Sequence, residues 1–281
     1  MIVKKLTLAD FPKRLSQLAD PPELLYARGQ FDFTKPTLAV IGSRSPSTYG
    51  KTVTEQLISS IRGYEINIIS GLALGVDGLA CRAGLDVGLA VGAVLPCGIE
   101  TIYPRTNQKL GENIISSNGI LISEYPGTTL PQKYQFIARN RIVAALADAV
   151  LIVEAAANSG SLHTASFALD LGTEVLAVPG PINSQLSVGT NMLIKQGARM
   201  ITSGADILDA LKISPRQKQQ PRLVFESPEE EKIYKALSAQ PLATENLQLN
   251  TNLEPIALQQ ALTLMEIRGE IVCVAGIWSL R

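Results

Sequence analysis

Short apolar segments alternate with longer amphipathic segments along residues 36–213, and this alternation restricts the fold more than any other feature of the chain. The apolar segments, which we predict to be strands, cover residues 37–41, 66–70, 91–95, 120–123, 149–153, 174–178 and 199–201. The predicted helices cover residues 50–62, 78–88, 107–117, 136–147, 162–171, 190–196 and 205–211. Strands that alternate with helices form a largely parallel sheet covered on both faces. We therefore predict an α/β fold whose ligand lies at the carboxyl ends of the strands.

The first predicted strand leads directly into Gly42, Ser43 and Arg44, ahead of a predicted helix. Glycine lets a backbone come close to a phosphate, a helix start directs N–H groups toward it, and an arginine can bond two of its oxygens. This turn is therefore a candidate phosphate site. An ordinary strand-to-helix turn with a surface arginine is the alternative.

Two nucleotide-binding motifs are excluded by their spacing. Gly50-Lys51-Thr52 resembles the end of a P-loop, but Ser45 stands where that motif requires a glycine. The loop after the second predicted strand, residues 70–78, does not have the glycine spacing of the dinucleotide fingerprint. We predict that this loop either holds a phosphate or approaches a neighbouring loop closely, and that Asp77 caps it. Its candidate phosphate residues are Ser70, Gly71 and Gly75.

Residues 133–161 combine a basic and aromatic cluster with a turn rich in hydroxyl groups. The cluster contains Lys133, Phe136, Arg139 and Arg141, and the turn contains Ser159, Gly160 and Ser161. Between them lies an apolar strand that ends at Glu154. Cations beside an aromatic ring suit a ligand that carries phosphates and bases to stack. An amphipathic helix with a solvated basic face is the alternative. Arg139 and Arg141 are as suited to brace the site through Glu154 and the turn as to contact phosphate.

The chain offers few groups for catalysis or metal binding. Three cysteines, Cys81, Cys97 and Cys273, lie far apart in the sequence, and His163 is the single histidine. This set cannot form a zinc cluster or a disulfide framework, and it fits a reducing cytoplasm. The spacing of the polar residues indicates neither a nucleophile–histidine pair nor a carboxylate pair. We therefore predict a binding protein rather than an enzyme, with no catalytic residue, metal or cofactor.

Three further segments flank residues 36–213. Residues 1–35 read as an irregular lead-in broken by prolines, with neither a secretory signal nor a membrane-spanning run. Residues 214–225 are rich in glutamine, proline and basic residues and are predicted to be a linker. Residues 226–281 combine predicted helices at 229–238, 244–249 and 254–268 with a hairpin at 271–274 and 277–280. Three helices followed by a hairpin are typical of a winged helix.

Charge is unevenly distributed, although the formal net charge is zero. Residues 226–281 carry eight glutamates against four basic residues, so residues 1–225 carry the compensating positive charge. The third predicted helix of the winged helix would face the groove in a duplex reader, yet it offers Glu254 and Glu266 and has Arg268 only at its far end. We therefore expect nucleic acid to bind the larger domain and not the winged helix.

Several short motifs follow one another in an order that resembles a known family. They are Gly42-Ser43-Arg44, Ser70-Gly71-x-Ala73-x-Gly75-x-Asp77, Ile102-Tyr103-Pro104-x-x-Asn107, Phe136-x-x-Arg139-Asn140-Arg141-Ile142, Val153-Glu154-Ala155, Ser159-Gly160-Ser161, Val178-Pro179-Gly180 and Gly189-Thr190-Asn191. Over about residues 10–211 the series resembles the DNA-processing protein A family, DprA, also called Smf. The linker and the C-terminal module are similar to the winged helix that many members carry.

The resemblance implies an extended Rossmann-like fold with a mostly parallel sheet and no nucleotide cofactor. It implies that the protein binds and protects single-stranded DNA during natural transformation. It also implies that the protein loads RecA onto strands coated with single-strand-binding protein. The expected form is a cytoplasmic homodimer that joins through the Rossmann-like domain and does not insert into a membrane.

The resemblance also implies which side chains contact DNA. Arg44 matches the family's DNA-contacting arginine, while Lys133 and Phe136 match a basic residue and a base-stacking aromatic. Arg105 occupies a basic position often seen after the Tyr-Pro pair, and Arg139 and Arg141 complete the predicted set. The alternative function is that of a nucleoside-monophosphate hydrolase of the lysine-decarboxylase-like group, which has a similar core. That group relies on a Pro-Gly-Gly-x-Gly-Thr-type loop, which this sequence does not contain.

Overall fold

The computed structural model describes residues 3–214, 227–268, 270–274 and 276–280. The chain divides into two compact units, residues 1–215 and 216–281, and each contains its own hydrophobic core. Most of the predicted linker, residues 214–225, lies outside the described residues. None of the helices in the described ranges is both long enough and apolar enough to cross a membrane.

The first unit is built on a mixed sheet that is parallel over most of its width. In the described residues it has nine strands in the order β1-β2-β6-β5-β4-β3-β7-β8-β9. The strands are β1 Lys4–Leu6, β2 Leu25–Gly29, β3 Thr37–Ile41, β4 Asn67–Ser70, β5 Ala90–Val94, β6 Ile120–Ser123, β7 Ala149–Ile152, β8 Glu174–Ala177 and β9 Arg199–Met200. All pairs from β6 to β9 are parallel, which confirms the predicted fold class. Every predicted strand is present, with its ends within one residue.

The N-terminal segment differs from the prediction, because residues 1–35 are not wholly irregular. Strand β2 pairs antiparallel with β6, and β1 pairs antiparallel with β2, so both extend the sheet. Two short 3₁₀ helices, Leu8–Asp10 and Lys13–Gln17, are the helical pieces expected there. In β2 only Leu25 and Ala27 are buried, so its alternation is too short to stand out in the sequence.

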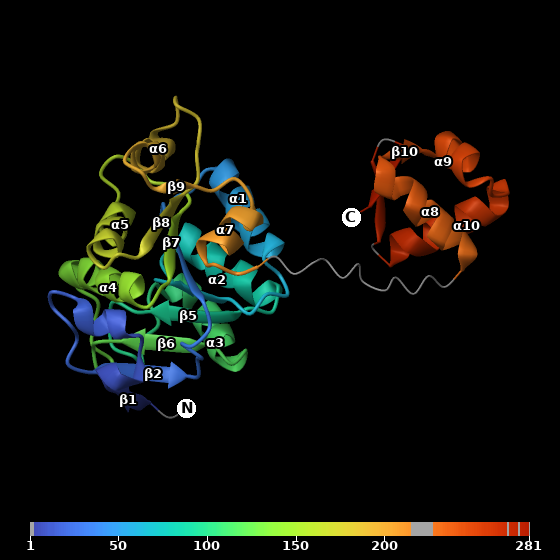
Figure 1. The fold of residues 1–281 in the computed structure, drawn as a ribbon. Helices are drawn as coiled ribbons and strands as arrows, with labels where there is room; N and C mark the ends of the chain where they lie inside the picture. Colours follow the sequence, from blue (N-terminus) through green and yellow to red (C-terminus); the bar gives the residue numbers. More distant parts are fainter. Residues whose placement is uncertain (1–2, 215–226, 269, 275, 281) are drawn as a thin grey trace. The chain divides into compact units, whose positions relative to one another are not determined.

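Helices cover both faces of the sheet, as predicted. Helices α1 Thr48–Ser60 and α2 Val76–Asp86 lie on one side of the strands, and α4 Lys133–Ala145 and α5 Gly160–Asp170 lie on the other (Figure 1). Side chains of α3 Gln108–Ser116 and α7 Gly204–Ala210 belong to the core on the first side. Side chains of α6 Val188–Lys195 belong to the core on the second.

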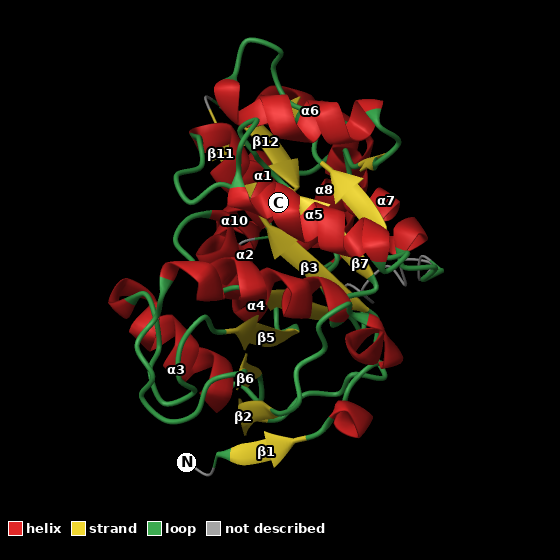
Figure 2. Ribbon diagram, turned by 90° about the vertical axis from the view of Figure 1, so that its left-hand side faces the viewer, coloured by secondary structure: helices red, strands yellow, loops and turns green. Residues whose placement is uncertain are grey.

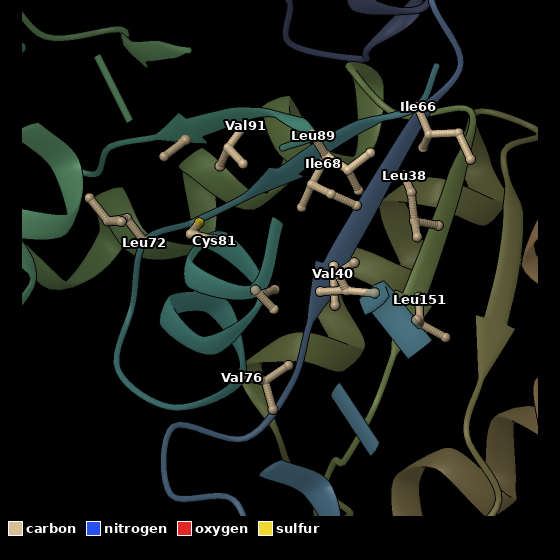
Figure 3. Close-up of a cluster of buried hydrophobic side chains, with 14 of the residues drawn as sticks. Leu38, Val40, Ile66, Ile68, Leu72, Val76, Cys81, Leu89, Val91 and Leu151 are labelled. Atoms are coloured by element: carbon tan, nitrogen blue, oxygen red, sulfur yellow. The ribbon is translucent and has the colours of Figure 1, made fainter. Parts of the chain in front are cut away.

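The two cores follow from the alternation of side chains along buried strands. Leu38 and Val40 of β3 belong to the core beneath α1 and α2, together with Ile68, Val91 and Cys81 (Figure 3). Ala39 and Ile41 of the same strand belong to the core beneath α4 and α5. A strand buried on both faces reads as a continuous apolar run, which is why the sequence pattern located it.

The strand order reverses at β3, and this reversal creates a crevice. From β3 the chain proceeds to β4, β5 and β6 on one side, then returns to β7 on the other side of β3. Ile41 and Ile152 are register partners at the ends of β3 and β7, so the loops that leave these strands start side by side. Figure 2 looks onto the face that carries α4, α5 and α6, with β3 and β7 behind them. Such a switch point is where ligands bind in open α/β sheets.

The second unit has the elements predicted for a winged helix. They are α8 Pro228–Ala239, β10 Leu242–Ala243, α9 Thr244–Thr251, α10 Pro255–Ile267, β11 Ile271–Val274 and β12 Ile277–Leu280. The sheet order is β10-β12-β11, all antiparallel. Helix α8 starts one residue before the predicted position 229. Ser227 caps it, because its Oγ accepts a hydrogen bond from the Glu230 N–H at 3.3 Å, and Pro228 follows the cap. The sequence did not predict β10, which is only two residues long.

Candidate nucleic-acid interface

A pocket of about 620 Å³ opens at the switch point. It is lined by the loops after β3 and β4, by one face of α4, by the turn before α5 and by residues 185–186, five segments that are distant in the sequence. The predicted site residues among its lining are Gly42, Ser43, Arg44, Phe136, Arg139, Ser159, Gly160 and Ser161. The fold therefore brings together several motifs that are far apart in the sequence.

Arg44 and Phe136 form the centre of the pocket wall. The Arg44 guanidinium carbon lies 5.1 Å from the centroid of the Phe136 ring, which is cation–π geometry. Tyr103 packs edge-on against the same ring, with centroids 5.7 Å apart and an interplanar angle of 72°. Arg44 and Tyr103 are exposed and Phe136 is half-buried, so all three can reach a ligand. Sequence reasoning missed Tyr103 as a site residue, although the Tyr-Pro motif that contains it was noted.

Glycine permits the close approach of the two loops that border this wall. The Val76 N–H donates to the Ser43 carbonyl at 3.0 Å, which ties the loop after β4 to the loop after β3. Gly75 has a φ of +76°, and a Cβ there would overlap the Ser43 carbonyl and the Arg44 backbone. Of the two roles predicted for the loop of residues 70–78, the structure supports close approach to a neighbouring loop.

Arg139 is buried and holds two loops in place. Its side chain is only 4% exposed, and its guanidinium donates to the Gly71 carbonyl and, at 2.7 Å, to the Val94 carbonyl. Asp77 lies nearby and accepts a hydrogen bond from the Gly71 N–H at 3.1 Å, which is the predicted capping role. Burial raises the pKa of the Asp77 carboxyl, and the charge of Arg139 opposes that rise. Burial also lowers the pKa of the Arg139 guanidinium.

One of the two roles considered for Arg139 and Arg141 was to brace the site through Glu154, and the partner in that interpretation is wrong. Arg141 pairs instead with Glu124 at 2.5 Å and with Asp20 at 3.5 Å. Glu154 is 2% exposed and accepts hydrogen bonds from the Ser47 N–H at 2.9 Å and from the Ser47 hydroxyl at 2.6 Å. A carboxylate at the start of a helix is stabilised by the helix dipole. The protein's own Glu154 therefore occupies the start of α1, which the sequence offered as a phosphate-binding helix start.

The connection predicted between Arg139 and the turn before α5 is present through Asn140. Arg139 Nε donates to the Asn140 side-chain oxygen at 3.2 Å, and Asn140 Nδ2 donates to the Gly160 carbonyl at 3.2 Å. Ser159 caps α5, because its hydroxyl accepts a hydrogen bond from the Ser161 N–H at 3.4 Å. The two serine hydroxyls lie 2.6 Å apart. The turn is thus fixed by the helix that carries Phe136.

The remaining predicted residues lie outside the main pocket. Lys133 is exposed at the first residue of α4, and Arg105 is exposed at the start of a 3₁₀ helix, Arg105–Asn107. Ser70 is fully buried and its hydroxyl donates to the Val40 carbonyl at 2.6 Å, so it has no surface for a phosphate. Buried Ser70, Arg139 and Arg141 have protein partners, and we therefore assign them to the support of the site.

The described residues contain no group of three or more His, Cys, Asp or Glu side chains that could hold a metal ion. Cys97 is buried, its thiol donates to the Thr101 carbonyl at 3.0 Å, and burial raises its pKa to about 11. A thiol with a raised pKa stays protonated at neutral pH and is therefore a poor nucleophile. His163 is an exposed residue of α5.

Comparison with known proteins identifies the family. The family model described as DNA recombination-mediator protein A matches residues 4–212 of the chain. The chain belongs to this family. A second model, described as the DprA winged helix domain, matches residues 206–276 and agrees with the fold of the second unit.

Named relatives of this recombination-mediator family are 34–41% identical to the chain. DNA processing protein DprA of Streptococcus pneumoniae is 40% identical over 199 residues, which are 70% of each protein. Putative DNA processing protein DprA of Mycobacterium tuberculosis is 34% identical over 268 residues, 92% of this chain and 69% of the relative. Protein Smf of Escherichia coli is 41% identical over 202 residues, and the chain spans only about half of its length, 54%.

Solved structures of the same family have the same fold. The X-ray structure of DprA from Streptococcus pneumoniae has a TM-score of 0.69 and 38% identity, and the similarity covers 73% of each chain. The structure of DNA processing protein A from Helicobacter pylori has a TM-score of 0.67 and 34% identity, over 75% of this chain and 95% of that one. The Helicobacter pylori protein is described as having a unique single-stranded DNA binding mode.

Proposed function

We propose that this protein is a recombination mediator that binds single-stranded DNA at the pocket between β3 and β7. The observation that carries the proposal is the exposed Arg44 guanidinium 5.1 Å from the Phe136 ring, at the switch point of the sheet. One wall of the pocket thus offers both a cation for a phosphate and an aromatic face for a base. The described DNA-binding mode of the Helicobacter pylori family member supports the same ligand.

The expected binding does not depend on base sequence. Every base can stack on an aromatic ring, and Arg44 and Lys133 contact phosphates that carry no sequence information. The formal net charge of the protein is zero, so long-range attraction to duplex DNA is weak. We expect modest affinity from one protomer and a gain by avidity in a homodimer that offers two pockets to one strand.

We further propose that the bound strand is protected and passed to RecA during natural transformation, on DNA coated with single-strand-binding protein. The family's description as a recombination mediator and the relatives' name, DNA processing protein, support this role. We assign the activity to the cytoplasm, where the free thiols of Cys81, Cys97 and Cys273 persist. Kinetics of RecA filament formation on coated single strands test it, and an unchanged nucleation rate in the presence of the protein would refute it.

Binding of a fluorescent oligothymidylate to the intact protein tests the primary proposal. We expect Arg44→Ala, Phe136→Ala and Lys133→Ala each to weaken binding by about tenfold, because each removes one phosphate or stacking interaction. Arg62→Ala is the matched control, since Arg62 is an exposed arginine beyond the far end of α1. Titrations at several salt concentrations give the number of neutralised phosphates, and removal of one cation from the interface should flatten the slope of log K by about 0.7. Equal binding by Arg44→Ala and Arg62→Ala would refute the proposal.

The hydrolase alternative receives no support from the carboxylates that border this edge of the sheet. Asp77 and Glu154 are both buried and accept hydrogen bonds from Gly71 and Ser47. Chromatography after incubation with nucleoside monophosphates tests this alternative. We expect no free base, and its release would support the hydrolase function.

A further inference from the structure

Helix α10 of the second unit carries aliphatic side chains on two opposite faces. Its buried face consists of Leu258, Ala261, Leu262 and Met265, which lie in the core of the unit. Its solvent face carries three more aliphatic side chains, Ile256, Leu264 and Ile267, which are 74%, 50% and 77% exposed. The uncharged Gln260 and Thr263 lie between them on the same face. A surface helix normally has charged residues on its outer face, yet Glu266 is the only charged residue within α10. An exposed aliphatic stripe of this kind marks a surface that binds a partner.

A hollow of about 500 Å³ lies at the turn between α9 and α10. Leu249, which is 76% exposed, and Leu253 supply its apolar lining, and Glu245 and Glu254 supply carboxylates. Glu254 is the residue before α10, so the hollow adjoins Ile256 at the start of the exposed stripe. We call the hollow and the stripe together the acidic–apolar face. Its residues are Glu245, Leu249, Leu253, Glu254, Ile256, Leu264, Glu266 and Ile267.

The carboxylates of this face carry negative charge that no neighbouring cation neutralises in the described part of the unit. Lys235 pairs with Glu231 at 2.7 Å and Arg268 pairs with Glu230 at 2.6 Å, so two basic side chains are neutralised elsewhere in the unit. Glu245, Glu254 and Glu266 have no ion pair within 4 Å among the residues that the structure describes. Negative charge concentrates beside exposed aliphatic groups, which repels the phosphates of DNA and also a second copy of the same face.

We propose that the acidic–apolar face binds a segment of another protein that presents aliphatic side chains flanked by lysine or arginine. An amphipathic basic helix has that chemistry: its apolar side covers Leu249, Ile256 and Ile267 while its cations meet the carboxylates of Glu245 and Glu254. In a winged helix that reads duplex DNA, the third helix enters the groove. In this protein the same helix is a protein-binding surface.

A synthetic 18-residue amphipathic peptide of leucine and lysine is the probe, and a leucine–glutamate peptide of the same pattern is its control. We expect the intact protein to bind the lysine peptide in fluorescence anisotropy and not the glutamate peptide. The double variant Ile256→Ser, Ile267→Ser should weaken binding by at least about tenfold, because it removes two anchors. Leu169→Ser, at a 61% exposed leucine of α5, is the matched control and should bind like the unaltered protein.

Circular dichroism melting verifies that the double variant is folded, and Glu245→Gln with Glu254→Gln is a second variant that leaves the aliphatic groups in place. Equal peptide binding by all three variants would overturn the proposal. Two other results would also overturn it. One is a dimer in sedimentation that only the Ile256→Ser, Ile267→Ser variant disrupts, and the other is duplex DNA binding that only this variant loses. Oligothymidylate binding should be unchanged in every variant, so failure of this inference and failure of the proposed pocket are distinguishable.

Discussion

At the scale of single residues, two arginines with the same charge have opposite environments. Arg44 is exposed and lies over the Phe136 ring, whereas Arg139 is 4% exposed and bonds to two backbone carbonyls. Both belong to motifs that the sequence marked as DNA-binding. Burial decides between the two roles, because only an exposed guanidinium can exchange water for phosphate oxygens at low cost.

Substitution by methionine should separate these roles. We expect Arg139→Met to lower the free energy of unfolding by about 3 kcal/mol, since it leaves two buried carbonyls without donors and the Asp77 carboxylate without its cation. Arg44→Met should change stability by less than about 0.5 kcal/mol while weakening oligothymidylate binding. Urea denaturation measures the first effect and anisotropy the second. Similar stability of the two variants would contradict the structural role of Arg139.

Asp77 should make stability depend on pH in a direction opposite to that of an ordinary paired carboxylate. Burial raises its pKa in the folded chain above the ordinary value of 3.8. The folded state therefore holds this proton more tightly than the unfolded chain, and the free energy of unfolding falls as pH rises from 3.8 to the raised pKa. Asp77→Asn keeps an acceptor for the Gly71 N–H, and because the amide does not titrate, its free energy of unfolding does not fall with pH at this position. Its stability relative to the unaltered protein should grow between about pH 3 and pH 7, and a constant difference would count against the raised pKa.

At the scale of elements, the site depends on how closely the loops after β3 and β4 approach. Gly75 and Gly88 have the same φ, +76°, but a Cβ on Gly75 would overlap the Ser43 carbonyl whereas one on Gly88 meets nothing within 4 Å. Gly88→Ala should lose about 1–2 kcal/mol from backbone strain at its positive φ, and Gly75→Ala should lose at least as much, because its ψ of −132° lies outside the left-handed helical region. Only Gly75→Ala should lose a further 1–3 kcal/mol or so from overlap and weaken DNA binding. Equal effects of the two substitutions would contradict the loop contact.

At the scale of the whole molecule, the chain consists of two units with separate cores. We expect residues 1–214 to fold alone and to bind oligothymidylate within about twofold of the full chain, because the pocket is lined only by that unit. Residues 227–281 alone should not bind it, because they carry an excess of glutamate. Calorimetry of the full chain should show two transitions. Loss of binding on removal of residues 215–281 would contradict this division.

Much of this organisation could be predicted from the sequence. The seven parallel strands were located within one residue, because strands buried on both faces are continuous apolar runs between helices. The motifs around Arg44 and Phe136 also indicated a common site at the carboxyl ends of strands. Strands β1 and β2 were missed, because they lie at the antiparallel edge of the sheet and have few buried residues.

Local patterns in the sequence were thus enough to predict the fold class, the family and the edge of the sheet at which we propose that DNA binds. Which polar groups face the pocket and which are buried depends on the folded chain. Arg139 meets the Gly71 carbonyl across 68 positions, and Glu154 meets Ser47 across 107. Strand and helix patterns arise from neighbours a few residues apart, but the burial of a charge depends on such long-range contacts, which no local pattern contains.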